Sequence, residues 1–207
     1  MLKTNELTLT DFSAALAAKQ SVPGGGGAAA YAGAMGCGLL AMAANFTLGK
    51  KKFLEYTDDL EQIIKTADAL RAEFENLIEE DAKNFEPLAA AYKIDKEDPK
   101  REWIINTALE RAAMAPLKMV QLSAMGIELG EELKGKCSAM LISDVACGLM
   151  LLKSAMEAAS VNVFINTSSF KDREKAKEME EQVDKWLGEY GLKAEALAAD
   201  ITKNIRK

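Results

Sequence analysis

The sequence Pro23-Gly24-Gly25-Gly26-Gly27 is followed by Ala28-Ala29-Ala30 and by a run of small residues that reaches Ala44. A glycine costs about 1 kcal/mol relative to alanine inside a helix, so consecutive glycines do not serve helix stability. We therefore expect a loop at residues 23–27 whose bare backbone closely approaches another group, and a helix that starts at Ala28. The alternative is that the glycines only let two helices touch.

The start of that helix is a candidate ligand site. Free backbone N–H groups and the positive end of the helix dipole both favour an anion or a polar ligand atom at this position. The candidate substrate-binding residues here are Pro23, Gly24, Gly25, Gly26 and Gly27.

The segment from Gln20 to Gly49 contains no charged side chain and is long enough to span a membrane. Gly and Ala dominate it, however, where a spanning helix would carry Leu, Ile and Phe, and the polar residues Asn45 and Thr47 lie near its end. We therefore expect a buried central helix and no membrane insertion.

The composition of the chain favours a helical protein. Of its 207 residues, 49% are hydrophobic and 6% aromatic, and only 4 are proline. This length suits a single domain over residues 1–207, and abundant Ala, Leu, Glu, Lys and Met favour helices. A net charge of −6 argues against a nucleic-acid partner, because such a partner requires a basic face.

The residue types also exclude several kinds of site. The chain has no histidine, so the commonest general base and the commonest zinc ligand are both missing. No cluster has the spacing of metal ligands, and we expect no metal site. The 3 cysteines have no paired spacing, and nothing at the N-terminus resembles a signal peptide, so we expect a cytoplasmic protein.

Apolar periodicity predicts an all-α, multihelical array of long and short helices. Besides the central helix from Ala28, the expected helices cover residues 11–19 with Thr10 as cap, 57–92, a long segment that begins at Asp98-Pro99, 138–159, 172–187 and 194–205. Residues 161–166 are β-branched and could pass for a strand. We expect the preceding helix to continue through them, because no partner strand is visible.

Two aspartates are candidate catalytic residues. Asp81 lies on the apolar stripe of the expected 57–92 helix, and Asp144 is the only charge between Lys136 and Lys153. A carboxylate held against apolar neighbours has a raised pKa and can act as an acid or a base near neutral pH. The alternative for each is a structural role as the buried partner of a Lys, an Arg or a backbone amide.

The triplet Lys50-Lys51-Lys52 closes the uncharged segment. It is typical of a solvated helix start, and it could also bind an anionic ligand on an otherwise acidic protein. Nucleotide-binding motifs do not fit the chain: Gly24-x-Gly26-x-x-Ala29 has no preceding strand, and Gly49-Lys50-Lys51 lacks the upstream Gly of a P-loop.

Four segments of the chain form a pattern that extends beyond these separate features. They are Ser21-x-Pro23-Gly24-Gly25-Gly26 with its Ala-rich helix, Leu48-Gly49-Lys50-Lys51-Lys52-Phe53, Asp81-Ala82-x-x-Phe85, and Ser143-Asp144 with Asn162-Val163-x-Ile165-Asn166. In this order they resemble the formiminotetrahydrofolate cyclodeaminase and methenyltetrahydrofolate cyclohydrolase family, over almost the whole chain. The resemblance implies an all-helical, dimeric enzyme that needs no cofactor beyond its tetrahydrofolate substrate.

The resemblance also implies a reaction. In 5-formiminotetrahydrofolate, the nitrogen at position ten attacks the formimino carbon, ammonia leaves, and the methenyl bridge of 5,10-methenyltetrahydrofolate forms. One alternative is a cyclohydrolase, which opens that bridge with water. A second alternative is a non-catalytic helical module that binds folate or serves as a scaffold.

Under this resemblance Asp81 and Asp144 move protons, the glycine loop grips the pterin or the carbon bridge through backbone N–H groups, and Lys50, Lys51 and Lys52 receive the glutamate tail. The implied partners are a second copy of the chain, a tetrahydrofolate derivative with or without a polyglutamate tail, and a separate formiminotransferase. Two departures from the family pattern are Gly27, where Ser is common, and Lys136, where Asn is expected.

Overall fold

The computed structural model describes residues 3–206, which form helices and no strand, so the expected all-α fold is confirmed. The α-helices are α1 (Leu9–Ala17), α2 (Gly25–Thr47), α3 (Thr57–Ala91), α4 (Arg101–Lys134), α5 (Ile142–Thr167), α6 (Arg173–Trp186) and α7 (Leu192–Ile205). Short 3-10 helices cover Thr4–Glu6 and Lys51–Tyr56, and a π-helical turn at Leu187–Gly191 joins α6 to α7.

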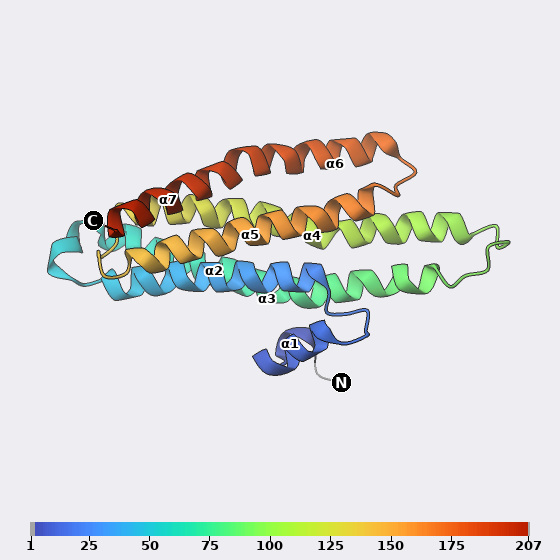
Figure 1. The fold of residues 1–207 in the computed structure, drawn as a ribbon, viewed down its shortest axis with the longest axis horizontal. Coiled ribbons are helices and arrows are strands. Elements are labelled where there is room, and N and C mark those ends of the chain that lie inside the picture. The colour runs from blue at the N-terminus through green and yellow to red at the C-terminus, as the bar shows by residue number, and fades with distance from the viewer. Residues whose placement is uncertain (1–2, 207) are drawn as a thin grey trace.

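Four long helices form the body of the protein and lie along its long axis (Figure 1). Helix α2 packs against α3 on one side and α5 on the other, while α4 packs against α3 and α5, which places α2 and α4 at opposite corners. Helices α6 and α7 return along α4 and α5. The short helix α1 lies outside this four-helix body.

The small residues of α2 allow its neighbours to come close. A Cβ atom placed on Gly33 would lie 2.5 Å from the ring of Phe74 on α3, and one placed on Gly36 would lie 2.8 Å from Leu152 on α5. Both glycines are buried in the middle of the helix. Their cost in helix propensity is therefore offset by the packing that they permit.

Helices α2 and α5 run antiparallel along their full lengths. Gly25 at the start of α2 faces Asn162 near the end of α5, and the middle of α2 contacts the Gly148 turn of α5. At the far end, Thr47 Oγ1 accepts a hydrogen bond of 3.0 Å from the Ser138 backbone N–H, just before α5. The start of one helix therefore lies beside the end of the other.

Helices α2 and α5 also meet the length and hydropathy of membrane spans, with mean hydropathy values of 1.4 and 1.3. In the fold, 61% of the α2 window and 44% of the α5 window are buried inside the protein. A core helix passes the same test of length and composition.

The structure corrects three helix starts. Helix α2 begins at Gly25 and not at Ala28, so the expected loop at residues 23–27 was wrong for Gly25, Gly26 and Gly27, which form its first turn. Helix α1 is capped by Thr8, whose side chain accepts from the Asp11 N–H, and not by Thr10. Helix α4 starts at Arg101, because the Asp98 carboxylate accepts from the Lys100 N–H at 2.8 Å in a turn before the helix.

Apart from the start of α5, the remaining helix predictions agree closely with the structure. Helix α3 covers almost the whole expected segment and continues through Pro87. Helix α5 begins at Ile142, four residues later than expected, and it continues through the β-branched residues 161–166 as predicted. Within residues 3–206 no strand is present to pair with this segment.

The unequal lengths of the helices create the place where a site can form. Helix α3 has 35 residues and α4 has 34, whereas α2 has 23. Both longer helices continue past the N-terminus of α2, where a second hydrophobic cluster joins them to α6 (Figure 1). That cluster includes Leu88, Leu109, Phe170 and Met179. The protein therefore has a step at the start of α2, walled by α3, α4 and α5.

Candidate functional site

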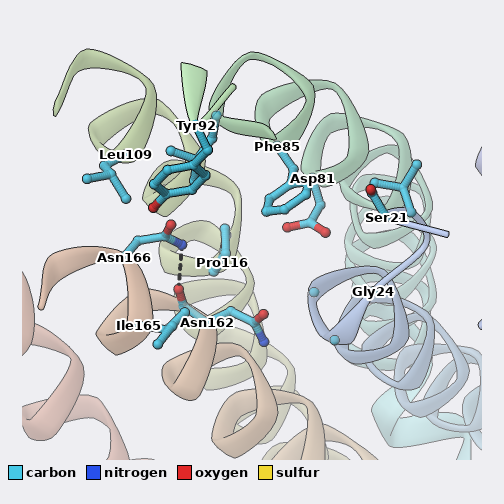
Figure 2. A pocket seen from close by; sticks show the side chains of 15 residues that line it. Ser21, Gly24, Asp81, Phe85, Tyr92, Leu109, Pro116, Asn162, Ile165 and Asn166 are labelled. Atoms are coloured by element: carbon cyan, nitrogen blue, oxygen red, sulfur yellow. Dashed lines mark hydrogen bonds between the residues drawn. The ribbon is translucent and has the colours of Figure 1, made fainter. Parts of the chain in front are cut away.

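A cavity of about 400 Å³ occupies this step, next to the first turn of α2. Figure 2 shows the side chains around it, with Asp81 and Ser21 on one side and Asn162 and Asn166 on the other. Apolar residues from α3, α4 and α5 form the wall between them, namely Phe85, Leu88, Leu109, Ala112, Pro116 and Ile165. Such a mixture of an apolar wall and a few convergent polar groups is typical of small-molecule sites.

Among the described residues, Asp81 is the only charged one that lines the cavity. Burial raises the pKa of its carboxyl from 3.8 to about 6, and the backbone N–H of Gly27 opposes this shift by stabilising the ionised form. No Lys or Arg in the described part of the chain contributes to the shift or forms an ion pair with Asp81. A carboxyl group with this pKa can accept and return a proton near neutral pH.

The first turn of α2 is in direct contact with Asp81. A Cβ atom on Gly26 would lie 2.3 Å from Asp81 Oδ1, which is closer than real Cβ atoms come to another atom. Glycine at position 26 therefore lets the carboxylate lie against the helix N-terminus. The N-cap residue Gly24 has no side chain to bond the first N–H groups, so those of Gly25 and Gly26 stay available to a ligand in the cavity, whereas the Gly27 N–H bonds Asp81.

The opposite side of the cavity carries two amides from α5. The Asn162 Nδ2 donates to the Ala158 carbonyl at 2.8 Å, and the Asn166 Nδ2 donates to the Asn162 carbonyl at 2.7 Å. Asn162 also lies against the glycine turn, because a Cβ on Gly25 would be 3.2 Å from its Nδ2. The start of α2 and the end of α5 therefore meet where Gly25 lies against the Asn162 amide.

The predicted site residues do not all meet at this cavity. Gly24, Gly25, Gly26 and Asp81 line it. Asp144 lies in the first turn of α5, beside Lys50 and Cys137, at the far end of α2. Since α2 rises about 1.5 Å per residue, its two ends lie roughly 33 Å apart. One chain alone therefore does not bring Asp81 and Asp144 together.

The three lysines lie at that same far end. Lys50 Nζ contacts Ser138 Oγ at 3.2 Å, whereas Lys51 and Lys52 are exposed in the 3-10 helix after α2. The sequence places all of them in one triplet, but it does not reveal which other helix ends lie near the triplet. The antiparallel packing of α2 on α5 separates the lysines from Asp81.

Two residues of the glycine segment lie behind the cavity wall. Pro23 is buried, and a Cβ on Gly27 would meet Pro23, Ile78 and Phe12 at 3.3 to 3.9 Å. A side chain at position 27 would thus face apolar neighbours and not the cavity, so Gly27 removes no hydroxyl from the cavity wall. Gly27 contributes through its backbone N–H, which acts on Asp81.

The other departure from the family pattern is structural. Lys136 Nζ lies 2.6 Å from an Asp59 carboxylate oxygen and 2.8 Å from one of Glu132. This ion-pair group connects α3 to the end of α4, away from the cavity.

Several cavity residues were not among the predicted site residues, namely Ser21, Phe85, Tyr92, Asn162 and Asn166. The four-residue spacing of Asn162 and Asn166 was a usable signal, because it places both side chains on one face of a helix. Tyr92 follows the last residue of α3, and nothing in its local sequence distinguishes it from a surface residue. Within residues 3–206, no group of His, Cys, Asp or Glu side chains is arranged to hold a metal ion.

The raised pKa of Asp81 predicts a pH-dependent stability. Between pH 4 and 6 the folded chain binds more protons at Asp81 than the unfolded chain does, so its free energy of unfolding falls as the pH rises. A shift from 3.8 to about 6 corresponds to a loss of about 3 kcal/mol at neutral pH. Asp81→Asn should remove this loss, and the mutant should be as stable as the native protein at pH 4 and more stable at pH 7.

Urea unfolding from pH 4 to 7 measures this difference. Asp58→Asn serves as the control, because Asp58 is exposed on the same helix. Identical pH dependence in the native protein and in Asp81→Asn would show that the Asp81 carboxylate is not desolvated.

The chain is similar to known proteins in both sequence and structure. The family model described as formiminotransferase-cyclodeaminase matches residues 8–185. A methenyltetrahydrofolate cyclohydrolase from Methylorubrum extorquens is 31% identical over 96% of this chain and 97% of its own length. The crystal structure of a formiminotetrahydrofolate cyclodeaminase from Thermotoga maritima superposes with a TM-score of 0.85, at 25% identity, over 97% of this chain and 100% of the other.

The formimidoyltransferase-cyclodeaminase of Rattus norvegicus is 26% identical over 81% of this chain. The aligned part makes up 32% of that longer protein, so this chain corresponds to about a third of it. The matched residues 8–185 include the glycine turn, Asp81, Asp144 and both cavity asparagines. The chain therefore belongs to the formiminotransferase-cyclodeaminase family.

Proposed function

We propose that this chain is a folate one-carbon enzyme that cyclises 5-formiminotetrahydrofolate to 5,10-methenyltetrahydrofolate and releases ammonia. The observation that carries the proposal is the desolvated Asp81 carboxylate, which faces a cavity between an uncapped helix N-terminus and an apolar wall. The names of the relatives from Rattus norvegicus and Thermotoga maritima support this reaction.

A second candidate is hydrolysis of the methenyl bridge. The Methylorubrum extorquens relative, named a methenyltetrahydrofolate cyclohydrolase, matches this chain over nearly the whole of both lengths. The two reactions share one carbon centre, which is attacked by the nitrogen at position ten in the first and by water in the second. A single general base beside that carbon can serve either reaction.

Asp81 is suited to the proton transfers of this chemistry. With a pKa of about 6 it is mostly ionised at pH 7, so it can accept the proton that the attacking nitrogen or water must lose. Its protonated form can then donate to the departing ammonia. The carboxylate also lies close enough to the cavity to stabilise the positive charge that the methenyl bridge carries.

The second proton-transfer group in our proposal is Asp144, supplied by a second copy of the chain. Two neighbouring stripes on α2 and α5 are uncharged and remain partly or fully exposed in the single chain. They consist of Ala28, Ala32, Met35, Leu39, Met42 and Phe46 on α2, and Cys147, Leu151, Ser154, Ala158, Val161 and Ile165 on α5. Phe46, Val161 and Ile165 are each more than 60% exposed. Apolar surface of this extent favours a homodimer.

A two-fold axis perpendicular to the two helices would cross near the middle of this surface, which we call the α2/α5 face. Each end of the α2/α5 face would then lie against the opposite end of the partner. Ile165 belongs both to the α2/α5 face and to the cavity wall, and Asp144 lies one turn before Cys147 at the other end. This arrangement would place Asp144 of the partner subunit near Asp81.

The same axis would bring the partner's lysine triplet to the cavity mouth. Within residues 3–206, Lys50, Lys51 and Lys52 form no ion pair with a carboxylate, so their charges remain available. An anionic glutamate tail, with or without further glutamates, is the part of the substrate that they suit.

The proposal includes a location and a second enzyme. All three cysteines are free thiols, which suits the reducing cytoplasm. A separate formiminotransferase is our proposed source of the formimino group, because the name of the Rattus norvegicus relative pairs the two activities.

The reaction is tested by following the absorbance of the methenyl bridge. The native protein should form the bridge from 5-formiminotetrahydrofolate, or consume it when given 5,10-methenyltetrahydrofolate, and the faster of the two defines the main activity. Asp81→Asn should lower turnover by about 10²–10⁴ fold, the usual effect of losing a general acid or base. Glu80→Gln, at an exposed neighbouring position, should not. If the native protein catalyses neither reaction, the chain is a non-catalytic module and the proposal is wrong.

The shared site is tested by mixing inactive subunits. Asp81→Asn and Asp144→Asn chains, coexpressed with different tags, should form heterodimers with one site that carries both mutations and one intact site. Random pairing would then restore about a quarter of the native activity. Coexpression of Asp81→Asn with the double mutant should restore none. If both mixtures stay inactive while the tags confirm heterodimers, each site belongs to a single subunit.

A further inference from the structure

Asn162 and Asn166 are two polar groups of the cavity that the proton-transfer chemistry does not use. They lie four residues apart on α5, and both side chains point toward the cavity (Figure 2). Each amide is held in place by a hydrogen bond from its Nδ2 to the backbone carbonyl four residues earlier. Because a carbonyl oxygen only accepts, this bond also fixes which side-chain atom is nitrogen and which is oxygen.

These hydrogen bonds leave a defined set of groups for a ligand. Each Nδ2 has two N–H groups and uses one of them, and neither Oδ1 accepts a hydrogen bond from any described residue. Each amide therefore offers one acceptor and one donor, with its orientation already fixed. Preorganised groups of this kind bind a ligand without a further loss of side-chain freedom.

We propose that Asn162 and Asn166 orient the pterin ring of the substrate by pairing with its lactam edge, an inference that rests on the proposed folate function. That edge presents the N3–H as a donor, the C4 carbonyl as an acceptor and the 2-amino group as a further donor. An amide carries the complementary acceptor and donor side by side. The pyrimidine ring of the pterin is planar and apolar on both faces, which suits the wall formed by Phe85, Leu88 and Pro116.

This orientation agrees with the position of Asp81. In the two-ring system, the C4 carbonyl of the lactam edge lies next to the nitrogen at position five. With the C4 carbonyl at Asn162, which lies against Gly25, the nitrogen at position five and its reacting carbon lie beside the glycine turn, where Asp81 is located. Asn162 and Asn166 are thus positioning residues that determine which heterocycle is accepted and which way it faces.

The inference is tested with a non-reacting ligand and its close analogue. Calorimetry would compare 5-formyltetrahydrofolate with the compound in which an amino group replaces the C4 carbonyl, since that change reverses the hydrogen-bonding character of the edge. The native protein should prefer the natural ligand by about tenfold or more, as expected for one or two hydrogen bonds made or lost. Asn162→Leu and Asn166→Leu should each weaken binding of the natural ligand and reduce this preference.

Asn204→Leu is the matched control, because Asn204 is exposed on α7 and its amide also donates to a group four residues earlier. It should leave both affinities unchanged. In the methenyl assay, the two cavity variants should raise KM about tenfold and change kcat much less. A loss of kcat with unchanged KM would make them catalytic and overturn the inference.

The outcomes also separate this inference from the proposed function. If the native protein turns over folate but binds both ligands equally well, the asparagines do not read the lactam edge and only the inference is wrong. If the native protein neither binds 5-formyltetrahydrofolate nor acts on folate, both are wrong.

Discussion

The close contact between the first turn of α2 and the Asp81 carboxylate is the constraint on which the site depends. Because Gly26 has no Cβ, the carboxylate lies directly against the backbone of a helix N-terminus. Burial disfavours its charge, while the Gly27 N–H favours it, and the balance places the pKa at about 6. A larger residue at position 26 would push α3 away from α2 and open the cavity wall. The same glycine thus determines both the geometry and the proton affinity of the site.

The rest of the architecture follows from the way that α2 is packed. A helix without charge and with small residues lets α3 and α5 approach closely, and its short length leaves a step where the longer α3 and α4 continue. That step holds the cavity. The remaining side of α2 has no covering helix within the described chain, and its apolar side chains continue onto α5. In our account a second copy covers this face and completes the site. The packing of α2 therefore determines both the assembly of the protein and the chemistry of its site.

Much of this was predictable from the sequence. The apolar stripe of α3 identified Asp81 as a carboxylate on a buried face, since periodicity reports which side of a helix meets the core. The start of α2 was not predictable, because helix propensity argues against Gly25, Gly26 and Gly27 and only contacts with α3 and α5 explain them. The separation of Asp144 from Asp81 was also missed. A sequence pattern identifies the face of a helix, but it does not identify which helix ends meet in space.

The central claim is that the Asp81 cavity is the folate site. It is tested most directly by a crystal structure of the protein with 5-formyltetrahydrofolate bound. Our account predicts that the pterin ring lies in the cavity between the first turn of α2 and the asparagines of α5, with the formyl carbon closest to the Asp81 carboxylate. The result that would contradict it is a ligand bound elsewhere with the cavity empty, for example in the larger groove between α5 and α7 beside Lys153 and Lys203.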